Sequence, residues 1–305
     1  MRTALVFPGQ GSQVVGMGRD LYDASPAARA IFDQADATLG FAITRLCFEG
    51  PEEALAATEN AQPALLTVSA ALLAELAPSA ESWSFVAGHS LGEYSALVAA
   101  GALDFPTALR LVRRRGELMA AADEGVMAAI IGMDEQSLET ICREASAVGA
   151  PVVIANYNSP GQLVISGAAT AVDRAMALAK QRGAKRILPL KVSAAFHSPL
   201  MHAAAEGLAQ AVGDVPIADA RVPIISNVLA EPLVDADAIR HELVAQVTAP
   251  VQWIASVRHI AEAGVDTFVE IGPGAVLTGL IKRITPGARL VNVGDLASAR
   301  AFLDQ

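Results

Sequence analysis

The fold is decided by an apolar run that ends in a serine between two glycines, Trp83-Ser84-Phe85-Val86-Ala87-Gly88-His89-Ser90-Leu91-Gly92. Its last five residues match G-x-S-x-G, the nucleophile elbow, in which a sharp strand-to-helix turn raises a serine hydroxyl above the edge of a sheet. A turn with an N-capping serine gives the same pattern, so the motif alone is a weak signal. Residues 83–87 read as the strand that feeds the turn, and residues 91–100 as a helix that ends at Gly101. This context favours Ser90 as a nucleophile.

Composition indicates a globular protein without a membrane or nucleic-acid partner. The chain has 305 residues, 53% of them hydrophobic and 18% charged, enough for one sizeable core and a smaller second one. Apolar runs stay far below the roughly 20 residues of a membrane span, so we expect no signal peptide and a cytoplasmic location. The net charge of −10 argues against nucleic-acid binding. Cys47 and Cys142 lack metal-ligand spacing, so we expect buried or half-buried thiols and no metal site.

Helices and strands alternate along the chain, which predicts an α/β protein with a largely parallel sheet. A first strand is expected at residues 2–7, and one helix is expected to begin at Pro63 and end at Leu76. Residues 126–193 have their own order, strand, helix, strand, strand, helix, strand, which is the ferredoxin-like βαββαβ pattern. We therefore predict an α/β-hydrolase-like domain of residues 1–125 and 194–305, with a small ferredoxin-like subdomain of residues 126–193 inserted in it and a cleft between the two.

A serine hydroxyl is nearly inert at neutral pH until a base takes its proton, so the base must be sought among five histidines. His197 follows the last strand of the insertion and immediately precedes Ser198-Pro199, which starts a helix. Catalytic groups collect at such strand-to-helix junctions in open α/β sheets. We expect His89 to be structural or part of a cleft wall. The other three histidines fall inside predicted helices, where a satisfied or solvent-facing side chain is the ordinary case: His202, His241 and His259.

Arg115 falls on the apolar stripe of a helix predicted between Asp104 and Asp123. A buried guanidinium must find an anion, either a structural carboxylate or the carboxylate of a ligand. Spacing alone favours the structural carboxylate. Arg113 and Arg114 project away from the stripe, and we expect them on a solvated face.

The glycines that follow the first strand do not form a nucleotide site. Gly9 and Gly11 are not followed by a third glycine at the required spacing, or by Gly-Lys-Ser/Thr. We expect these glycines instead to bring backbone amides, and Gln10, close to the top of the sheet.

Seven stretches, in order and spanning nearly the whole chain, resemble the malonyl-CoA:acyl carrier protein transacylases of bacterial fatty acid synthesis, to which the acyltransferase domains of polyketide synthases are closely related. They are FPGQGSQ (7–13), GHSLGEY (88–94), RRGELM (114–119), NYNSPGQLVISG (156–167), AAFHSPLM (194–201), PVQW (250–253) and EIGPG (270–274). Any one of them alone is unspecific, whereas the set together is highly specific.

The resemblance implies a role for each matching residue. Ser90 would accept the acyl group from coenzyme A, and His197 would activate it and later deprotonate the thiol of the carrier protein. The backbone amides of Gln10 and Leu91 would form the oxyanion hole. The backbone carbonyl of the PVQW glutamine, Gln252, would orient the histidine in place of an acid.

The resemblance also implies the substrates. Malonyl-CoA would be the donor and acyl carrier protein the acceptor, with no metal or other cofactor, because exchange between thioesters is close to thermoneutral. Arg115 would hold the malonyl carboxylate in a bidentate pair, and Phe196 would disfavour an α-methyl branch. The carrier is acidic in this family, so a local basic patch is expected to dock it; the candidates are Lys180, Arg182, Lys185, Arg186 and Lys191.

Other functions stay open at this level. A standalone polyketide acyltransferase or a malonate decarboxylase component would share the motifs. A serine esterase or thioesterase would share Ser90 and His197, but it would not need a buried Arg115 and would release free acid. A noncatalytic acyl-binding protein would keep the fold, although it would not need to retain both the serine and the histidine.

Overall fold

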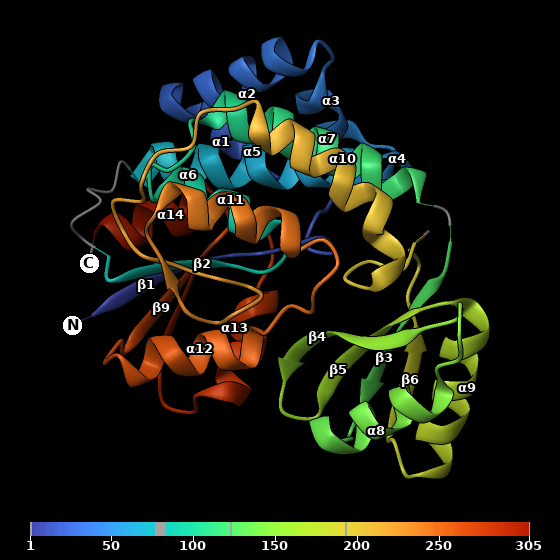
Figure 1. Cartoon of the computed structure of the whole chain (residues 1–305). Coiled ribbons are helices and arrows are strands. Elements are labelled where there is room, and N and C mark those ends of the chain that lie inside the picture. Colours follow the sequence, from blue (N-terminus) through green and yellow to red (C-terminus); the bar gives the residue numbers. More distant parts are fainter. Residues whose placement is uncertain (1, 77–82, 123, 193, 305) are drawn as a thin grey trace.

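A computed structural model describes residues 2–76, 83–122, 124–192 and 194–304. It contains a large, mostly parallel sheet and a smaller antiparallel one (Figure 1), so the predicted α/β class is confirmed. The strand order of the large sheet is β10-β9-β1-β2-β7-β8, and only β8 runs antiparallel to its neighbour. Its strands are β1 (Thr3–Phe7), β2 (Phe85–Gly88), β7 (Ile224–Ile225), β8 (Pro232–Leu233), β9 (Thr267–Ile271) and β10 (Arg289–Val293).

Both faces of the large sheet are covered, as parallel sheets require. Successive side chains of β1 enter different cores: Leu5 and Phe7 pack on one face, and Ala4 and Val6 on the other. Helices α5, α6 and α7 lie on the first side and α12 and α13 on the second (Figure 1). These helices are α5 (Thr58–Leu76), α6 (Gly92–Ala99), α7 (Phe105–Ala121), α12 (Trp253–Glu262) and α13 (Val276–Ile284).

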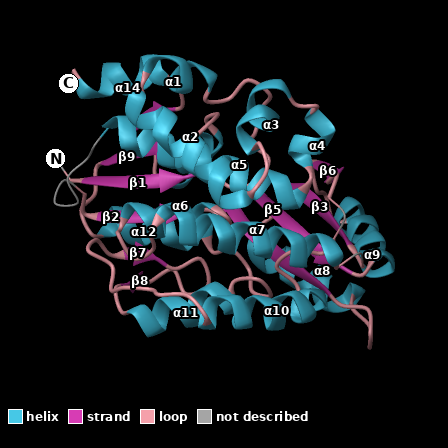
Figure 2. Ribbon diagram, turned by 90° about the horizontal axis from the view of Figure 1, so that it is seen from above, coloured by secondary structure: helices cyan, strands magenta, loops and turns pink. Residues whose placement is uncertain are grey.

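The remaining helices outside the small sheet contribute buried side chains to the core on the same face of the large sheet as α5, α6 and α7. Figure 2 shows their arrangement from above. Ser25 caps α2 by accepting a hydrogen bond from the Ala28 amide, with Pro26 in the first turn, as the Ser-Pro pair predicts. The elements are α1 (Arg19–Ala24), α2 (Pro26–Leu39), α3 (Ile43–Glu49), α4 (Glu52–Ala56), the short 3-10 helix η2 (Pro199–Met201), α10 (His202–Gly213), α11 (Ala236–Ala245) and α14 (Leu296–Leu303).

The small sheet has the strand order β4-β5-β3-β6, and every pairing in it is antiparallel. The order of elements in this segment is the predicted one, and its last strand ends at Pro189. The elements are β3 (Val126–Ile131), α8 (Glu135–Ala145), β4 (Val152–Ser159), β5 (Gln162–Gly167), α9 (Ala169–Gln181) and β6 (Arg186–Pro189).

Strand β4 also contacts the segment that precedes α12. The Tyr157 amide donates to the Val251 carbonyl at 3.0 Å, and the Val251 amide donates to the Ala155 carbonyl at 2.8 Å. This bridge ties the small sheet to the rest of the chain beside the site described below.

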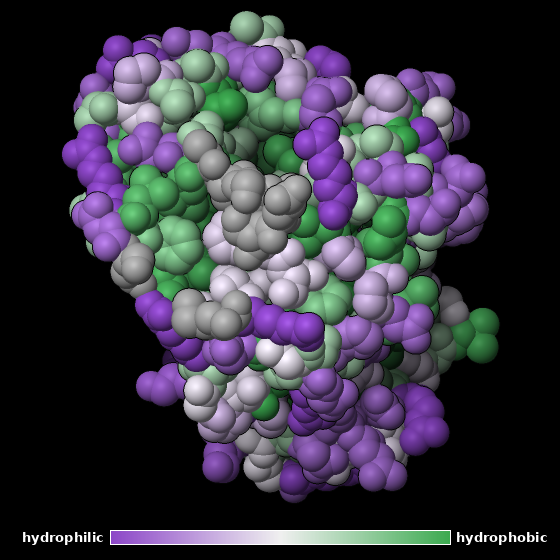
Figure 3. All heavy atoms as spheres, turned by 90° about the vertical axis from the view of Figure 1, so that its left-hand side faces the viewer, coloured by the Kyte–Doolittle hydropathy of each residue, from purple (hydrophilic) through white to green (hydrophobic). Residues whose placement is uncertain are grey.

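The surface in Figure 3 mixes hydrophilic and apolar side chains, as folded proteins ordinarily do. Among the described residues, no helix is both long enough and apolar enough to cross a membrane.

Candidate active site

Ser90 lies in the tight turn between β2 and α6, as the G-x-S-x-G pattern predicts. Its φ of 50° is in the left-handed region, which residues with a side chain rarely adopt. A Cβ on Gly88 would lie 1.9 Å from the Gly92 carbonyl, and a Cβ on Gly92 would lie 2.1 Å from the Phe7 carbonyl oxygen. Only glycine therefore fits on either side of the turn.

Two side-chain amides hold the backbone of Ser90 in this conformation. The Ser90 N–H donates to Asn227 Oδ1 at 2.7 Å. The Ser90 carbonyl accepts from Gln246 Nε2 at 3.0 Å. Asn227 Nδ2 also donates to the Gly88 carbonyl at 2.7 Å, so the same amide binds both sides of the turn. Nothing in the sequence had singled out Asn227 or Gln246.

His197 contacts the Ser90 hydroxyl directly. Its Nε2 lies 2.8 Å from Ser90 Oγ, and its Nδ1 lies 2.8 Å from the Gln246 carbonyl oxygen and 3.1 Å from that of Ala249. Because carbonyl oxygens only accept, Nδ1 carries the proton and Nε2 is free to accept the hydroxyl proton. The ring is 3% exposed. Burial, followed by the positive charge of Arg115, lowers the pKa of His197 to about 3, which keeps the imidazole neutral.

The prediction that Gln252 orients this histidine is wrong. The Gln252 carbonyl accepts from the amide and hydroxyl of Ser256 inside α12, at 2.9 and 3.0 Å. Backbone carbonyls do orient His197, but they belong to Gln246, the C-cap residue of α11, and to Ala249, in the turn that follows the helix. The last carbonyls of a helix lack donors within the helix, so they are available to an outside N–H.

Arg115 is buried beside the serine, with 1% exposure. Its Nη1 donates to Gln62 Oε1 at 2.8 Å, and its Nη2 donates to Gln246 Oε1 at 2.8 Å and to Ser90 Oγ at 3.1 Å. Its Nε has no hydrogen-bond partner among the residues that the structure describes. No carboxylate in the described part of the chain forms an ion pair with it, so the structural carboxylate that its spacing favours is not found there. Burial lowers the pKa of the guanidinium.

A close helix crossing places Arg115 at the site. A Cβ on Gly116 would lie 2.7 Å from Glu59 Cα, so glycine allows α7 to approach the first turn of α5. This approach brings Arg115 within reach of Gln62. Arg114 is exposed, as predicted, and approaches Glu117 at 3.9 Å. Arg113 is half-buried instead of solvated: it pairs with Glu117 at 2.7 Å, and its Nη1 donates to Asn60 Oδ1 at 2.8 Å.

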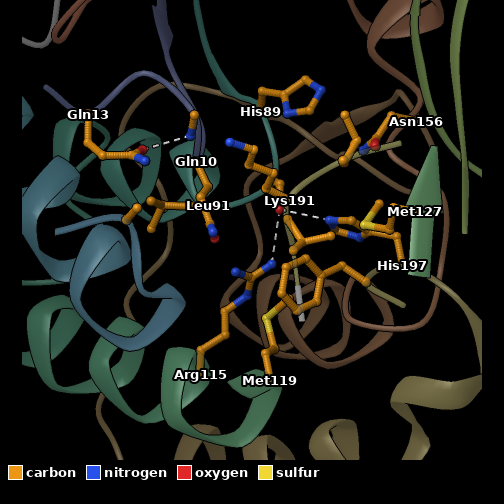
Figure 4. Close-up of a pocket in the computed structure, with 16 residues that line it drawn as sticks. Gln10, Gln13, His89, Leu91, Arg115, Met119, Met127, Asn156, Lys191 and His197 are labelled. Carbon is orange, nitrogen blue, oxygen red and sulfur yellow. Dashed lines mark hydrogen bonds between the residues drawn. The ribbon is translucent and has the colours of Figure 1, made fainter. Parts of the chain in front are cut away.

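These groups open into a cavity of about 320 Å³ between the two sheets. Figure 4 shows Gln10 and Leu91 on one side of it and His197 and Met127 on the other, and the dashed lines from Arg115 and His197 meet at Ser90 Oγ. None of the hydrogen bonds among the described residues uses the backbone amide of Gln10 or of Leu91. Other lining residues include Phe196, Asn156, Met119 and Lys191.

The other singled-out residues have structural positions. His89 contacts Asn158 Oδ1 at 2.8 Å and packs edge-on against Trp253, so it forms part of the cavity wall. His202 lies at the surface beside Glu206 at 3.4 Å. The two free cysteines are buried, as predicted, and burial raises the pKa of each thiol to about 12: Cys47 and Cys142.

Comparison with known proteins places this geometry in context. Residues 4–296 match the acyl transferase domain family. The malonyl CoA-acyl carrier protein transacylase of Bacillus subtilis is 49% identical over 297 residues, which cover 96% of this chain and 94% of that protein. The protein of the same name from Staphylococcus aureus strain MRSA252 is 43% identical, over 99% of this chain and 98% of its own.

Solved structures agree over the full length. The acyl-carrier-protein-S-malonyltransferase of Bartonella henselae is 44% identical with a TM-score of 0.97, covering 100% of this chain and 99% of that one. A malonyl-transacylase in complex with a type II PKS acyl-carrier protein is 45% identical with a TM-score of 0.95, again covering 100% and 99%.

Proposed function

The chain belongs to the acyl transferase family, and from this premise we propose that it transfers a malonyl group from malonyl-CoA to the phosphopantetheine thiol of an acyl carrier protein through a malonyl ester on Ser90. One observation carries the choice of substrate: a buried guanidinium, without a carboxylate partner among the described residues, donates to the hydroxyl of the nucleophile. A hydrolase for uncharged esters would have no use for it.

In the first half-reaction, Ser90 Oγ attacks the thioester carbonyl of malonyl-CoA while His197 Nε2 takes the hydroxyl proton. The carbonyl oxygen becomes negative and is stabilised by the amides of Gln10 and Leu91. As the tetrahedral intermediate collapses, the carbon–sulfur bond breaks and the imidazolium returns its proton to the coenzyme A sulfur. The products are the Ser90 ester and free coenzyme A.

In the second half-reaction, the carrier thiol gives its proton to His197 and its sulfur attacks the ester carbonyl. Ser90 leaves and recovers the proton from the imidazolium. His197 accepts and returns the proton in both half-reactions, and no oxidation occurs. We therefore propose that the reaction needs neither a metal nor another cofactor. A neutral imidazole with a fixed Nδ1 proton suits both steps, because it can accept a proton in each.

Arg115 would hold the malonyl carboxylate through its Nε and Nη2 atoms. These two groups are adjacent on the guanidinium and can bind both oxygens of a carboxylate. Within the described ranges Nε has no hydrogen-bond partner, and Nη2 already lies 3.1 Å from the oxygen that becomes acylated. Phe196, which lines the same cavity, would disfavour an α-methyl branch by about 1 to 3 kcal/mol, the usual range for one methyl group.

We further propose that the acidic carrier docks beside Lys191. This lysine lines the cavity, whereas Arg182 is already paired with Glu144. We also propose a cytoplasmic location.

We propose that residues 1–125 and 194–305 form an α/β-hydrolase-like domain and that residues 126–193 form a ferredoxin-like subdomain. The small sheet supports the second assignment, because it combines βαββαβ order with antiparallel pairing throughout.

The test is a two-step labelling experiment. The protein is incubated with malonyl-CoA, the malonylated peptide is mapped by mass spectrometry, and phosphopantetheinylated carrier protein is then added. We expect label on Ser90, its transfer to the carrier, and no label in Ser90→Ala. Release of free malonate in the presence of carrier would indicate a hydrolase instead. Carriers from fatty acid and polyketide synthesis, compared at equal concentration, would separate these two pathways.

A further inference from the structure

Glu93 is a buried carboxylate three residues after the nucleophile, in the first turn of α6, with 1% exposure. Asn227 donates to Glu93 Oε1 from its backbone and from Nδ2, both at 3.0 Å, and Gln246 Nε2 donates to Glu93 Oε2. Within the described residues, no lysine or arginine forms an ion pair with it. Burial and the nearby Glu242 raise the pKa of this carboxyl, whereas the three donors against its two oxygens favour the ionised form. A carboxylate held here without a cation requires an explanation, because buried carboxylates are rare unless paired.

Gln246 stands between Glu93 and Arg115. Its Nε2 donates to Glu93 and to the Ser90 carbonyl, and its Oε1 accepts from Arg115 Nη2. A side-chain amide can sit in two orientations, but a carboxylate only accepts and a guanidinium only donates. The reversed amide would set its oxygen against the carboxylate and the Ser90 carbonyl, and its NH₂ group against the guanidinium. The negative charge at one end and the positive charge at the other therefore select one orientation.

Asn227 is oriented by the same carboxylate. Its Nδ2 donates to Glu93, which leaves Oδ1 to accept from the Ser90 N–H. Both polar backbone groups of Ser90 are thus bound by side-chain amides whose orientation Glu93 determines.

We propose that Glu93 is a positioning residue that fixes the orientation of the Gln246 and Asn227 amides. It also acts as an indirect counter-ion of Arg115, because the Gln246 amide bridges the two side chains. This proposal rests on the function proposed above. A carboxylate in direct contact would occupy the Nε and Nη2 groups that the malonyl carboxylate needs. A carboxylate behind an amide neutralises part of the buried charge and leaves that edge of the guanidinium open to substrate.

Glu93→Gln tests the proposal, with Glu242→Gln as its matched control. Glu242 is also buried, at 6% exposure, and its carboxylate accepts from the Ser226 hydroxyl and the Val228 amide; among the described residues it forms no hydrogen bond with the side chain of Gln246 or Asn227. Its charge helps to raise the pKa of Glu93, so Glu242→Gln favours the ionised Glu93 and leaves the Gln246 bridge in place. The readout is kcat/KM for Ser90 acylation by malonyl-CoA and by acetyl-CoA, together with the melting temperature of each variant.

We expect Glu93→Gln to lower kcat/KM for malonyl-CoA by about 10- to 100-fold, the scale of a small misplacement of a binding group. The preference for malonyl-CoA over acetyl-CoA should fall by about tenfold or more, and it should stay within about threefold of wild type in Glu242→Gln. Equal losses for both substrates in Glu93→Gln, or the same selectivity change in both variants, would show that Glu93 is merely structural.

A stability cycle keeps the test decisive if Glu93→Gln alone unfolds. If the two buried charges are coupled, Arg115→Met and Glu93→Gln should each lower the melting temperature. The melting temperature of the double variant should then be no lower than that of the less stable single variant. Additive losses would overturn the coupling. The cycle does not depend on substrate, so it separates a failure of this inference from a failure of wild-type protein to react with malonyl-CoA.

Discussion

Replacing Arg115 by methionine should convert a malonyl-selective site into one that hardly distinguishes malonyl-CoA from acetyl-CoA. Methionine is unbranched and adaptable, so it can fill much of the space of the arginine stem without the charge. The malonyl carboxylate is proposed to accept two hydrogen bonds, from Nε and Nη2. Hydrogen bonds to charged groups contribute about 1.5 to 3 kcal/mol each. Their loss therefore amounts to about 3 to 6 kcal/mol, or about 10² to 10⁴ in kcat/KM.

Acetyl-CoA has no carboxylate, so its reaction should lose only the contact of Arg115 Nη2 with Ser90 Oγ at 3.1 Å. One such bond, at the same 1.5 to 3 kcal/mol, corresponds to a loss of about 10- to 10²-fold, which is smaller than the loss expected for malonyl-CoA. The selectivity ratio, and not the absolute rate, is therefore the quantity that isolates the carboxylate. It is obtained from initial rates of Ser90 acylation with each thioester, measured by intact-protein mass spectrometry.

Arg114→Met is the matched control, because Arg114 is the neighbouring residue on the same helix but is exposed, and its ion pair in the described part of the chain is with Glu117 at 3.9 Å. We expect its selectivity ratio to equal that of wild type. An Arg115→Met protein that folds and loses activity equally toward both thioesters would refute the assignment of the carboxylate to Arg115.

Two further predictions follow from the geometry around Ser90. Because burial and Arg115 lower the pKa of His197 to about 3, Ser90 malonylation measured by rapid-quench labelling should stay level from about pH 8 down to about pH 5. A decline with a midpoint near the ordinary histidine pKa of about 6.5 would contradict this. The unfolded chain binds that proton first, so the buried His197 should cost about 1.4 kcal/mol of stability per pH unit between about pH 6.5 and about pH 3, and no more below that range. Gly92→Ala should lower the free energy of unfolding by about 1 to 3 kcal/mol and abolish Ser90 labelling, because its Cβ would lie 2.1 Å from the Phe7 carbonyl oxygen. Gly279→Ala is the control: a Cβ there would have no described atom within 4 Å, so labelling should be unchanged and stability unchanged or slightly raised. Equal denaturation midpoints for the two variants would count against the steric account.

The parts of this site that local sequence determines could be predicted. Gly88 and Gly92 flank a turn in which a Cβ at either position would overlap backbone atoms. Both positions therefore require glycine, and the motif can be recognised from the sequence alone. The position of His197 between a strand and a Ser-Pro helix start is also a local signal. The strand and helix order of residues 126–189 follows from the alternation of hydrophobic patterns in the same way.

Element boundaries depended on tertiary contacts and were harder to predict. Proline favours the first turn, so a helix was expected to begin at Pro63, yet α5 begins at Thr58. Proline inside a helix leaves the carbonyl four residues earlier without its donor. That carbonyl belongs to Glu59, and Arg113 Nη1 donates to it at 3.0 Å from α7. The replacement donor comes from a residue 54 positions away, which no local rule could supply.

Gln246 shows why the histidine-orienting group was misplaced and what that implies. Its backbone carbonyl orients His197, and every residue has such a carbonyl, so residue type carries no signal for this role. The position is determined instead by where α11 ends relative to a histidine 49 residues earlier. The side chain of Gln246 does matter for its role, because its amide donates to Glu93 through Nε2 and accepts from Arg115 through Oε1 at the same time. The site should therefore tolerate changes of side chain at Ala249, which contributes only a carbonyl, and should fail on a one-residue insertion between Gln246 and Ala249, which would displace an acceptor without removing any functional side chain.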